Sequence, residues 1–332
     1  MQRTLGLITG AVIAAILLAG CGKTYPVGAT VPTPTPAAPS ETSSYTVPTS
    51  ASFPIGITSS SNAIWFTEES GDKIALLDES ATFTEFPLPN AGSEPYGITF
   101  GPDGNLWFTE YATGANKIGR YDPSTANFAE FAIPTASALA TSIVLGSDGA
   151  LWFTESGTNR IGRATLAGSI TDYAVAGTTP LNAAEGSDGS VWFTLNGSNQ
   201  IGSITPGETV TLYTIPTAAS QPFDIVPGSD GALWFTERAT GKLGRIATNG
   251  SITETTLTGC ASPGALRQGV DGDFYVFCTS GSPTVLQYNP QTAAMKSFPL
   301  KAGSVPQLAI IAFDNKLYFT DSGLNAIGQF TY

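Results

Sequence analysis

The sequence predicts an all-β fold made of seven similar repeats, each long enough for one small sheet. Five tryptophans stand at one phase of the repeat, and each is followed by Phe-Thr: Trp65, Trp107, Trp152, Trp192 and Trp234. Tyr275 and Tyr318 continue the series. These anchors lie roughly 40–45 residues apart, the length of a four-stranded blade. Seven such units predict a seven-bladed β-propeller with four-stranded blades.

The composition supports this fold. The 332 residues include 37 glycines and 23 prolines, and only 12% of them are charged. Many short strands joined by tight turns have this composition, and no segment after residue 50 has the pattern of an amphipathic helix. Because a closed ring of repeats remains one domain at this length, we predict a single folded domain.

The second repeat shows where the strands lie within each unit. From the centre of the ring to its rim, alternating apolar residues predict strands over 96–100, 106–110, 117–121 and 128–133. Gly-Pro-Asp-Gly joins the first two, and related Asp-Gly turns follow at 146–149, 186–189, 228–231 and 269–272. Asp-Gly between apolar runs is a hairpin signal, so we interpret these aspartates as turn residues and not as ligands.

The last repeat predicts how the ring closes. Its strands are expected over 307–312, 316–320 and 326–331, with no fourth strand after them. Near the N-terminus, residues 44–48 resemble the outer strands of other repeats, such as 83–87. We therefore predict that an N-terminal outer strand completes the last blade and hides its edge, which places the propeller at residues 44–332.

The first 20 residues have the pattern of a signal peptide. Arg3 gives a positive end, an apolar stretch follows, and Leu18-Ala19-Gly20-Cys21 resembles the lipobox of bacterial lipoproteins. That resemblance implies that residues 1–20 are removed and that Cys21 is acylated and anchored in a lipid bilayer. Gly22 resembles the pattern for the outer membrane of a Gram-negative host. An ordinary signal peptide with a chance cysteine is the alternative.

Residues 21–43 are predicted to form a tether. They are rich in Pro, Thr and Ser and contain almost no large apolar side chains. Such a segment cannot offset the conformational entropy that packing removes. The sequence thus predicts an extracytoplasmic propeller held at the bacterial cell envelope by a spacer.

Two further cysteines are available for oxidation in an exported chain. Cys260 is expected in the loop after an outer strand, and Cys278 at the end of the second strand of the next repeat. Both places lie on one face of a propeller. We predict a Cys260–Cys278 disulfide, with two separate thiols as the alternative.

Three segments resemble the repeats of a known enzyme family. They are GPDGNLWFTE at 101–110, TNRIGR at 158–163 and TLYTIPTAASQPFDI at 211–225, within a resemblance that spans residues 44–332. They are similar to the virginiamycin B lyases, also called streptogramin lyases. The resemblance implies that a divalent metal, usually Mg²⁺, helps to open a cyclic depsipeptide antibiotic by elimination at its ester bond, with histidine as the base.

Histidine is the part of this pattern that the chain lacks. The sequence contains none, and the positions that match those of the family's histidines are Ile55, Tyr96, Thr141, Leu181, Phe223, Gly264 and Gln307. None of these side chains takes up a proton near neutral pH. Glu94 and Glu110 match the family's acidic positions, which makes them the candidate ligands for Mg²⁺ or Ca²⁺. Tyr96 or a carboxylate is the candidate base.

The acid that ends the Trp-Phe-Thr-Glu motif recurs around the ring. The acids are Glu68, Glu110, Glu155, Glu237 and Asp321, with Leu195 and Cys278 at the two remaining positions. A ring of carboxylates favours a hard cation. Alternatively, acids pair with bases across neighbouring strands, because the four glutamates are followed in order by Lys73, Lys117, Arg160 and Lys242.

The net charge argues against some partners. The chain carries −12, and loss of Arg3 leaves 13 bases against 26 acids, which gives −13. Nucleic acid is therefore not expected as a partner. Three functions fit these residues. We favour a non-catalytic module that binds a small ligand or an envelope protein, and the alternatives are a metal-dependent lyase and a lactonase of gluconolactonase type.

Overall fold

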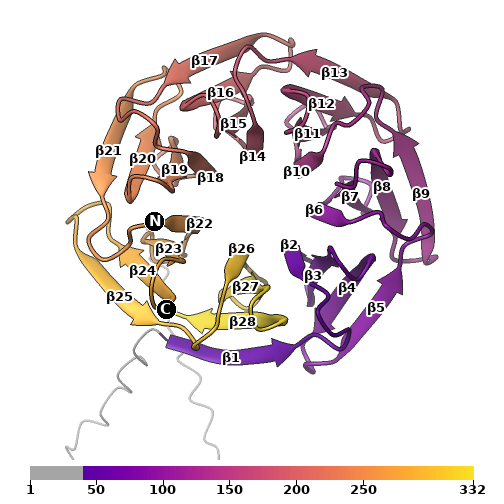
Figure 1. The fold of residues 1–332 in the computed structure, drawn as a ribbon, viewed down its shortest axis with the longest axis horizontal. Helices are drawn as coiled ribbons and strands as arrows, with labels where there is room; N and C mark the ends of the chain where they lie inside the picture. Colours follow the sequence, from indigo (N-terminus) through magenta and orange to yellow (C-terminus); the bar gives the residue numbers. More distant parts are fainter. Residues whose placement is uncertain (1–39) are drawn as a thin grey trace, which may run out of the picture. The chain divides into compact units, whose positions relative to one another are not determined.

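The computed structural model describes residues 40–332, which form seven antiparallel sheets of four strands each around a central axis (Figure 1). The predicted seven-bladed β-propeller is confirmed. The signal segment, Cys21 and the tether up to residue 39 lie outside the described residues. Within the described part, no helix is long and apolar enough to span a membrane.

Each blade contributes one strand to each of four concentric layers. The inner strands are β2 (Pro54–Ser59), β6 (Pro95–Phe100), β10 (Ala140–Leu145), β14 (Pro180–Glu185), β18 (Pro222–Pro227), β22 (Pro263–Gln268) and β26 (Pro306–Ile311). The second strands are β3 (Ala63–Glu68), β7 (Leu106–Glu110), β11 (Leu151–Glu155), β15 (Val191–Leu195), β19 (Leu233–Glu237), β23 (Phe274–Cys278) and β27 (Leu317–Asp321). The third strands are β4 (Lys73–Asp78), β8 (Lys117–Asp122), β12 (Arg160–Ala164), β16 (Gln200–Ile204), β20 (Lys242–Ile246), β24 (Thr284–Tyr288) and β28 (Ala326–Thr331). The outer strands are β5 (Phe83–Pro87), β9 (Asn127–Ala132), β13 (Ile170–Ala174), β17 (Val210–Thr214), β21 (Ile252–Thr256), β25 (Met295–Pro299) and β1 (Ser40–Thr46).

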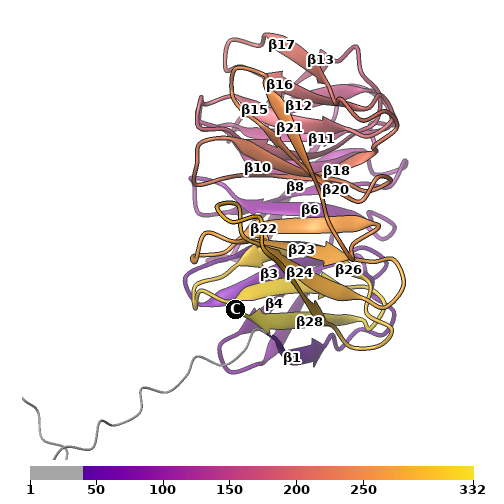
Figure 2. The same cartoon turned by 90° about the vertical axis from the view of Figure 1, so that its left-hand side faces the viewer.

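Strand β1 closes the ring by completing the sheet of the last blade. It pairs antiparallel with β28, starting from Ser40 opposite Thr331 (Figures 1 and 2). The predicted closing strand is confirmed, but it begins at Ser40 and not at residue 44. It is longer than predicted because β28 continues to Thr331 and offers backbone groups along this whole length. An unpaired edge on β28 is thereby avoided.

The tryptophan of the motif is tied to the hairpin before it. Trp107 Nε1 donates to Asp103 Oδ1 at 3.3 Å, and the same bond occurs at three other tryptophans: Trp152, Trp192 and Trp234. Asp103 Oδ1 also accepts the backbone N–H of Asn105 at 3.2 Å, within the turn. The aspartates of the Asp-Gly turns therefore act as turn residues, as predicted.

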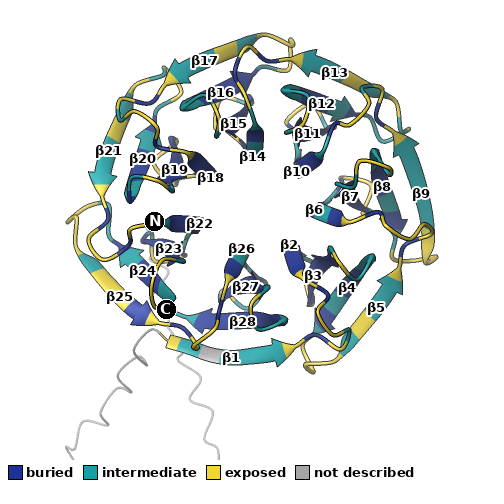
Figure 3. Ribbon diagram, in the orientation of Figure 1, coloured by how far each residue is buried: buried dark blue, intermediate teal, exposed yellow. Residues whose placement is uncertain are grey.

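The phenylalanine of the motif explains a glycine on the third strand. The Phe108 ring lies against Gly119, where a Cβ would come within 2.1 Å of the ring. Phenylalanine faces glycine in the same way at Gly162, Gly202, Gly244 and Gly328. These rings are buried, and Figure 3 shows buried positions gathered on the inner layers while exposed positions mark the outer strands. Any larger residue at these glycines would force the ring out of the core.

The threonine of the motif connects neighbouring blades. The Thr109 hydroxyl donates to the carbonyl of Thr141 on the next inner strand at 2.9 Å and accepts the Gly97 N–H at 2.9 Å. Equivalent bonds to the next blade start from Thr67, Thr154, Thr194, Thr236 and Thr320. In the sixth blade Phe277 stands at this position. Hydrogen bonds therefore join the blades close to the axis as well as the strands within each blade.

The substitution Thr109→Val should lower the free energy of unfolding by about 1–3 kcal/mol, because it leaves the buried Gly97 N–H without its acceptor. Urea unfolding followed by tryptophan fluorescence measures the loss. Thr84→Val is the matched control, since Thr84 is exposed on β5. Equal stabilities of the two variants would contradict the role of this threonine.

Candidate functional site

One side of the ring carries the loops that enter the seven inner strands, and we call this side the loop face. Most of these loops are held by a side chain from the turn between the second and third strands of the preceding blade. Asn116 Oδ1 accepts the backbone N–H of Ala138 at 2.8 Å, while its Nδ2 donates to the carbonyls of Ile133 and Thr135. The equivalent residues in four other blades bind their loops too: Asp72, Asn159, Asn199 and Asn325.

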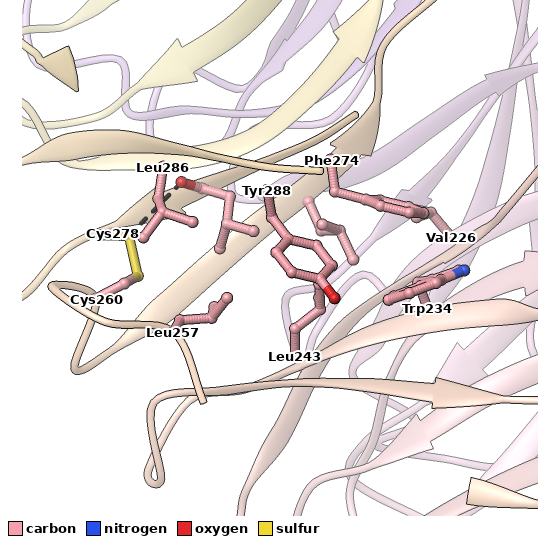
Figure 4. Packing of buried hydrophobic residues seen from close by; sticks show 11 residues of the cluster. Val226, Trp234, Leu243, Leu257, Cys260, Phe274, Cys278, Leu286 and Tyr288 are labelled. Carbon is pink, nitrogen blue, oxygen red and sulfur yellow. Dashed lines mark hydrogen bonds between the residues drawn. A yellow bond between two sulfur atoms is a disulfide. The ribbon is translucent and has the colours of Figure 1, made fainter. Parts of the chain in front are cut away.

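The fifth blade has Gly241 at this turn position, so no side chain can hold the next loop. There the structure has a disulfide. Cys260 in the loop is bonded to Cys278 at the end of β23, and their Cα atoms are 5.3 Å apart (Figure 4). Leu257 and Leu286 pack beside the two sulfur atoms in the same buried cluster. The covalent bond thus stands where the hydrogen-bonding side chain is missing.

The sixth blade has Pro283 at the turn position, and its following loop is held by an acid. Asp321 accepts the Ser304 hydroxyl at 2.5 Å and the backbone N–H of Val305 at 2.8 Å. This acid ends β27, so it occupies the motif position that carries glutamate in other blades. Aspartate reaches the loop directly because its shorter side chain keeps the carboxylate close to the strand end.

Four motif glutamates lie completely buried beneath the loops, with 0% of their surface exposed: Glu68, Glu110, Glu155 and Glu237. At least one carboxylate oxygen of each has no hydrogen-bond partner among the described residues. A buried carboxylate without partners is costly when ionised. These acids therefore belong to the interior of the blades and not to an open ring of ligands on the loop face.

The predicted pairing of these glutamates with the neighbouring base is wrong. Glu68 does lie opposite Lys73 in the strand register, but the Lys73 ammonium binds Glu85 of the outer strand at 2.6 Å. Lys117 and Lys242 likewise bind outer-strand acids, Glu130 at 2.5 Å and Glu254 at 3.7 Å. The ammonium group stays partly solvated at the outer strand, whereas contact with the buried glutamate would desolvate it fully.

A blade of this kind therefore contains two acids, the buried motif glutamate and the outer-strand acid, but only one base. One of the two acids keeps its proton. Burial raises the pKa of Glu68 to about 7, and the charge of Glu85 adds to this rise. Burial also raises the pKa of Glu110 and Glu237 to about 7 and that of Glu155 to about 8. Although burial opposes it, hydrogen bonds from Lys73 and Thr49 lower the pKa of Glu85. The outer acid is ionised and the buried one is neutral over much of the acidic range.

The three candidate site residues lie at different depths. Glu94 is exposed in the loop before β6, with φ at 50°, and its backbone N–H donates to Asp72 Oδ1 at 3.0 Å. Tyr96 is the second residue of the inner strand β6, and its ring centroid lies 5.5 Å from that of Tyr111. Burial raises the pKa of Tyr96 to about 12, so its hydroxyl is neutral at physiological pH. Glu110 is fully buried.

Glu94 and Glu110 stay predicted metal ligands, because the structure neither joins them in a larger ligand group nor sets Glu110 apart from the equivalent glutamates. Carboxylates suit Mg²⁺ or Ca²⁺, and both Glu110 oxygens lack hydrogen-bond partners, but the oxygens of Glu68 lack them equally. Within residues 40–332, no three or more acidic or cysteine side chains are grouped closely enough to hold a metal ion. We therefore assign no reaction step to a metal.

Residues that the sequence-based prediction did not include also reach the inner rim of the loop face. Arg238 lies over the Phe223 ring, with its guanidinium carbon 3.5 Å from the ring centroid. Phe53 is 39% exposed and Val305 is 42% exposed, in the loops that enter two adjacent blades. Tyr111 and Arg238 both directly follow the motif glutamate, a position that also holds Glu69, Ser156, Asn196, Thr279 and Ser322. The residue type at this position varies from blade to blade while the rest of the motif is regular. That variation is the sequence signal that could have indicated Tyr111 and Arg238.

Comparison with known proteins agrees with this architecture. The model of the Virginiamycin B lyase family matches residues 40–294 and 177–332. Virginiamycin B lyase from Staphylococcus aureus, solved with selenomethionine, is 31% identical, has a TM-score of 0.81, and covers 87% of this chain and 98% of its own. A catalytically inactive histidine-to-alanine variant from the same organism, solved with quinupristin, is 31% identical with a TM-score of 0.82 and the same coverage. Virginiamycin B lyase from Nocardia farcinica is 31% identical over 60 residues, which span 18% of this chain and 22% of that relative.

Stability should fall as the pH rises from 5 to about 8.5. The buried glutamates have raised pKa values when folded and an ordinary value of 4.5 when unfolded, so between these values the folded state holds more protons. The loss is on the order of 1–3 kcal/mol per glutamate. Although burial opposes it, hydrogen bonds lower the pKa of Glu85 and of Glu254, so these two outer-strand acids ionise below this range and do not offset the loss.

Urea unfolding at the two pH values measures this change. A variant with glutamine at all four buried positions should lose most of the pH dependence: Glu68→Gln, Glu110→Gln, Glu155→Gln and Glu237→Gln. A stability of the unsubstituted chain that stays constant or rises from pH 5 to about 8.5 would show that these acids are not held neutral.

Proposed function

The chain belongs to the virginiamycin B lyase family, and on this basis we propose that it is a lipid-anchored propeller that binds a small ligand or an envelope protein at its loop face without chemical turnover. The identity of residue 96 carries this proposal. Tyrosine stands there in place of the histidine implied by the resemblance to the lyases. A phenol with a pKa of about 12 is a poor base at neutral pH, and the chain contains no histidine elsewhere.

The surface of the loop face supports a binding role. Of the three large apolar side chains that are exposed among the described residues, Phe53 and Val305 lie on this face, and Val270 lies in a hairpin on the opposite one. Phe53 and Val305 precede the inner strands of two adjacent blades, and exposed apolar side chains that gather on one face can form a binding surface. The loops that present them are tied to the preceding blades or strand ends, so the surface is formed before a partner arrives.

The N-terminal segment supports attachment to the cell envelope. Residues 1–20 carry the signal pattern, Cys21 carries the lipobox pattern, and the Pro-, Thr- and Ser-rich composition after Cys21 is typical of a tether. A propeller held in this way meets ligands at the envelope. A fold alone does not define a function, and the anchor therefore contributes independently to the proposal.

A lyase remains the second candidate because of one observation. Glu110 matches an acidic position of the lyases, its carboxylate has no hydrogen-bond partner among the described residues, and its pKa is raised to about 7. A carboxylate with this pKa is suited to general acid–base catalysis. The S. aureus relative solved with quinupristin indicates the substrate class to test.

Quinupristin incubated with the full chain and Mg²⁺ should be recovered unchanged, as measured by chromatography with mass detection. The S. aureus relative serves as the positive control. An isomer of equal mass, formed by the unsubstituted chain and not by Glu110→Gln, would overturn the non-catalytic proposal in favour of a lyase. A product heavier by one water would instead indicate hydrolysis of the lactone.

The substitution Cys21→Ala should move the chain from the membrane fraction to the soluble fraction of a bacterial host, because Cys21 is the residue that the lipobox pattern marks for acylation. Incorporation of a labelled fatty acid into the chain, followed on a gel, should disappear in the same variant. Cys260→Ala is the control and should keep the label. Membrane association that survives Cys21→Ala, together with an unchanged label, would refute the anchor.

A further inference from the structure

Arg238 lies at the inner rim of the loop face, beside the inner strands β18 and β22. It follows the last residue of β19, and its guanidinium lies 3.5 Å from the centroid of the Phe223 ring. Its Nη2 is 3.7 Å from the place where a Cβ on Gly264 would lie. Phe223 and Gly264 are channel-side residues at the start of β18 and β22. The cation is therefore held between the starts of the inner strands of two neighbouring blades.

Arg238 has no anionic partner within residues 40–332. Its Nε is buried and lacks a hydrogen-bond partner, and none of the ion pairs among these residues includes it. Asp224 is the nearby acid, but its Oδ2 is bound by the backbone N–H of Leu266 and by Arg267 Nη1, both at 2.9 Å. The charge that could neutralise Arg238 is thus already committed to Arg267.

A partly buried guanidinium without an anion is unfavourable, and its contact with an aromatic ring offsets only part of the lost hydration. Burial lowers the pKa of Arg238, which is the sign of this cost. The three arginines that lie over a motif tryptophan, Arg120, Arg163 and Arg245, each have a further polar partner; Arg163, for example, binds Asp148 at 2.7 Å. Arg238 is therefore arranged like a binding residue and not like these structural arginines.

The side chains near Arg238 determine the charge and the apolar surface of an anion that could bind there. Tyr96 and Tyr111 lie side by side in the second blade, with their ring centroids 5.5 Å apart and their planes tilted by 36°. Glu69 and Glu94 stand on the same side as the tyrosines, and burial together with the charge of Glu94 raises the pKa of Glu69. These acids repel a multiply charged anion, so a single negative charge on a partly apolar body fits best.

We propose that Arg238 pairs with the carboxylate of a singly charged organic acid, whose apolar part packs against Phe223, Tyr96 and Tyr111. This inference rests on the proposed binding function and names the ligand class of the same face. A guanidinium binds a carboxylate through two parallel hydrogen bonds, and the exclusion of water by the aromatic rings strengthens that pairing.

The test uses the full chain and three probes: N-acetylphenylalanine, its neutral amide and inorganic phosphate. Calorimetric titration gives the affinities, and thermal unfolding without a probe gives the stability. Arg238→Met removes the charge while keeping most of the side-chain bulk. Arg238→Lys keeps the charge without the planar donor pair. Arg163→Met is the matched control, because that arginine also lies over an aromatic ring but is paired with Asp148.

N-acetylphenylalanine should bind the unsubstituted chain and the Arg163→Met variant equally. Arg238→Met should weaken this binding by about 10-fold or more, and Arg238→Lys should lie between. The amide and phosphate should bind more weakly than the carboxylate. Without a probe, Arg238→Met should unfold at the same or a higher temperature than the unsubstituted chain, since it removes a partly buried charge that has no ion-pair partner among residues 40–332.

Equal binding of the carboxylate and the amide, equal carboxylate binding by Arg238→Met, or no carboxylate binding would each overturn the inference. A clear fall in the unfolding temperature of Arg238→Met would also count against it, because it would identify a structural arginine. A separate result distinguishes failure of the Arg238 inference from failure of the proposed binding function. Amide binding that is lost in Phe53→Ser but kept in Val270→Ser would preserve a binding site on the loop face while excluding its anion selectivity.

Discussion

Each loop that enters an inner strand must be fixed to its surroundings, and the rest of the structure depends on this constraint. The loops cross from the rim of one blade to the axis of the next, where unpaired backbone groups would otherwise be buried. Asn116 shows the common solution, in which one amide group binds two carbonyls and one N–H of the following loop. Asn325 does the same for the first blade by binding Ser52, so the ring closes with side-chain bonds as well as through β1.

In two blades the residue at the turn position has no side chain that can bind the next loop, and the loop is nevertheless fixed by another contact. Gly241 cannot bind a loop, and the disulfide between Cys260 and Cys278 joins the loop to the next blade instead. Pro283 cannot bind one either, and Asp321 takes over. The motif glutamate occupies the same place beneath the loop in other blades. Its burial keeps it neutral and prevents it from acting as a surface ligand, which leaves the character of the loop face to residues beside it.

Much of this fold could be predicted from the sequence, because its signals are local and repeated. Alternating apolar residues, Asp-Gly turns and the spacing of the tryptophans identify the strands, and the resemblance of residues 44–48 to an outer strand identifies the closing strand. The pairing of Lys73 was predicted wrongly because only two strands were compared. Its true partner, Glu85, lies on the next strand outward. Arg238 was missed because its contacts come from different blades, and no repeat pattern relates residues that meet at the axis.

Hydrogen–deuterium exchange of the full chain, compared with the Cys260→Ser, Cys278→Ser double variant, tests the central role of the loop attachments most directly. Loss of the disulfide should speed exchange in the loop at 258–262 and at the start of β22, while loops held by Asn116 or Asn199 keep their protection. Unchanged exchange in the loop at 258–262, or faster exchange spread evenly over all seven blades, would contradict the view that each loop is held by its own local attachment.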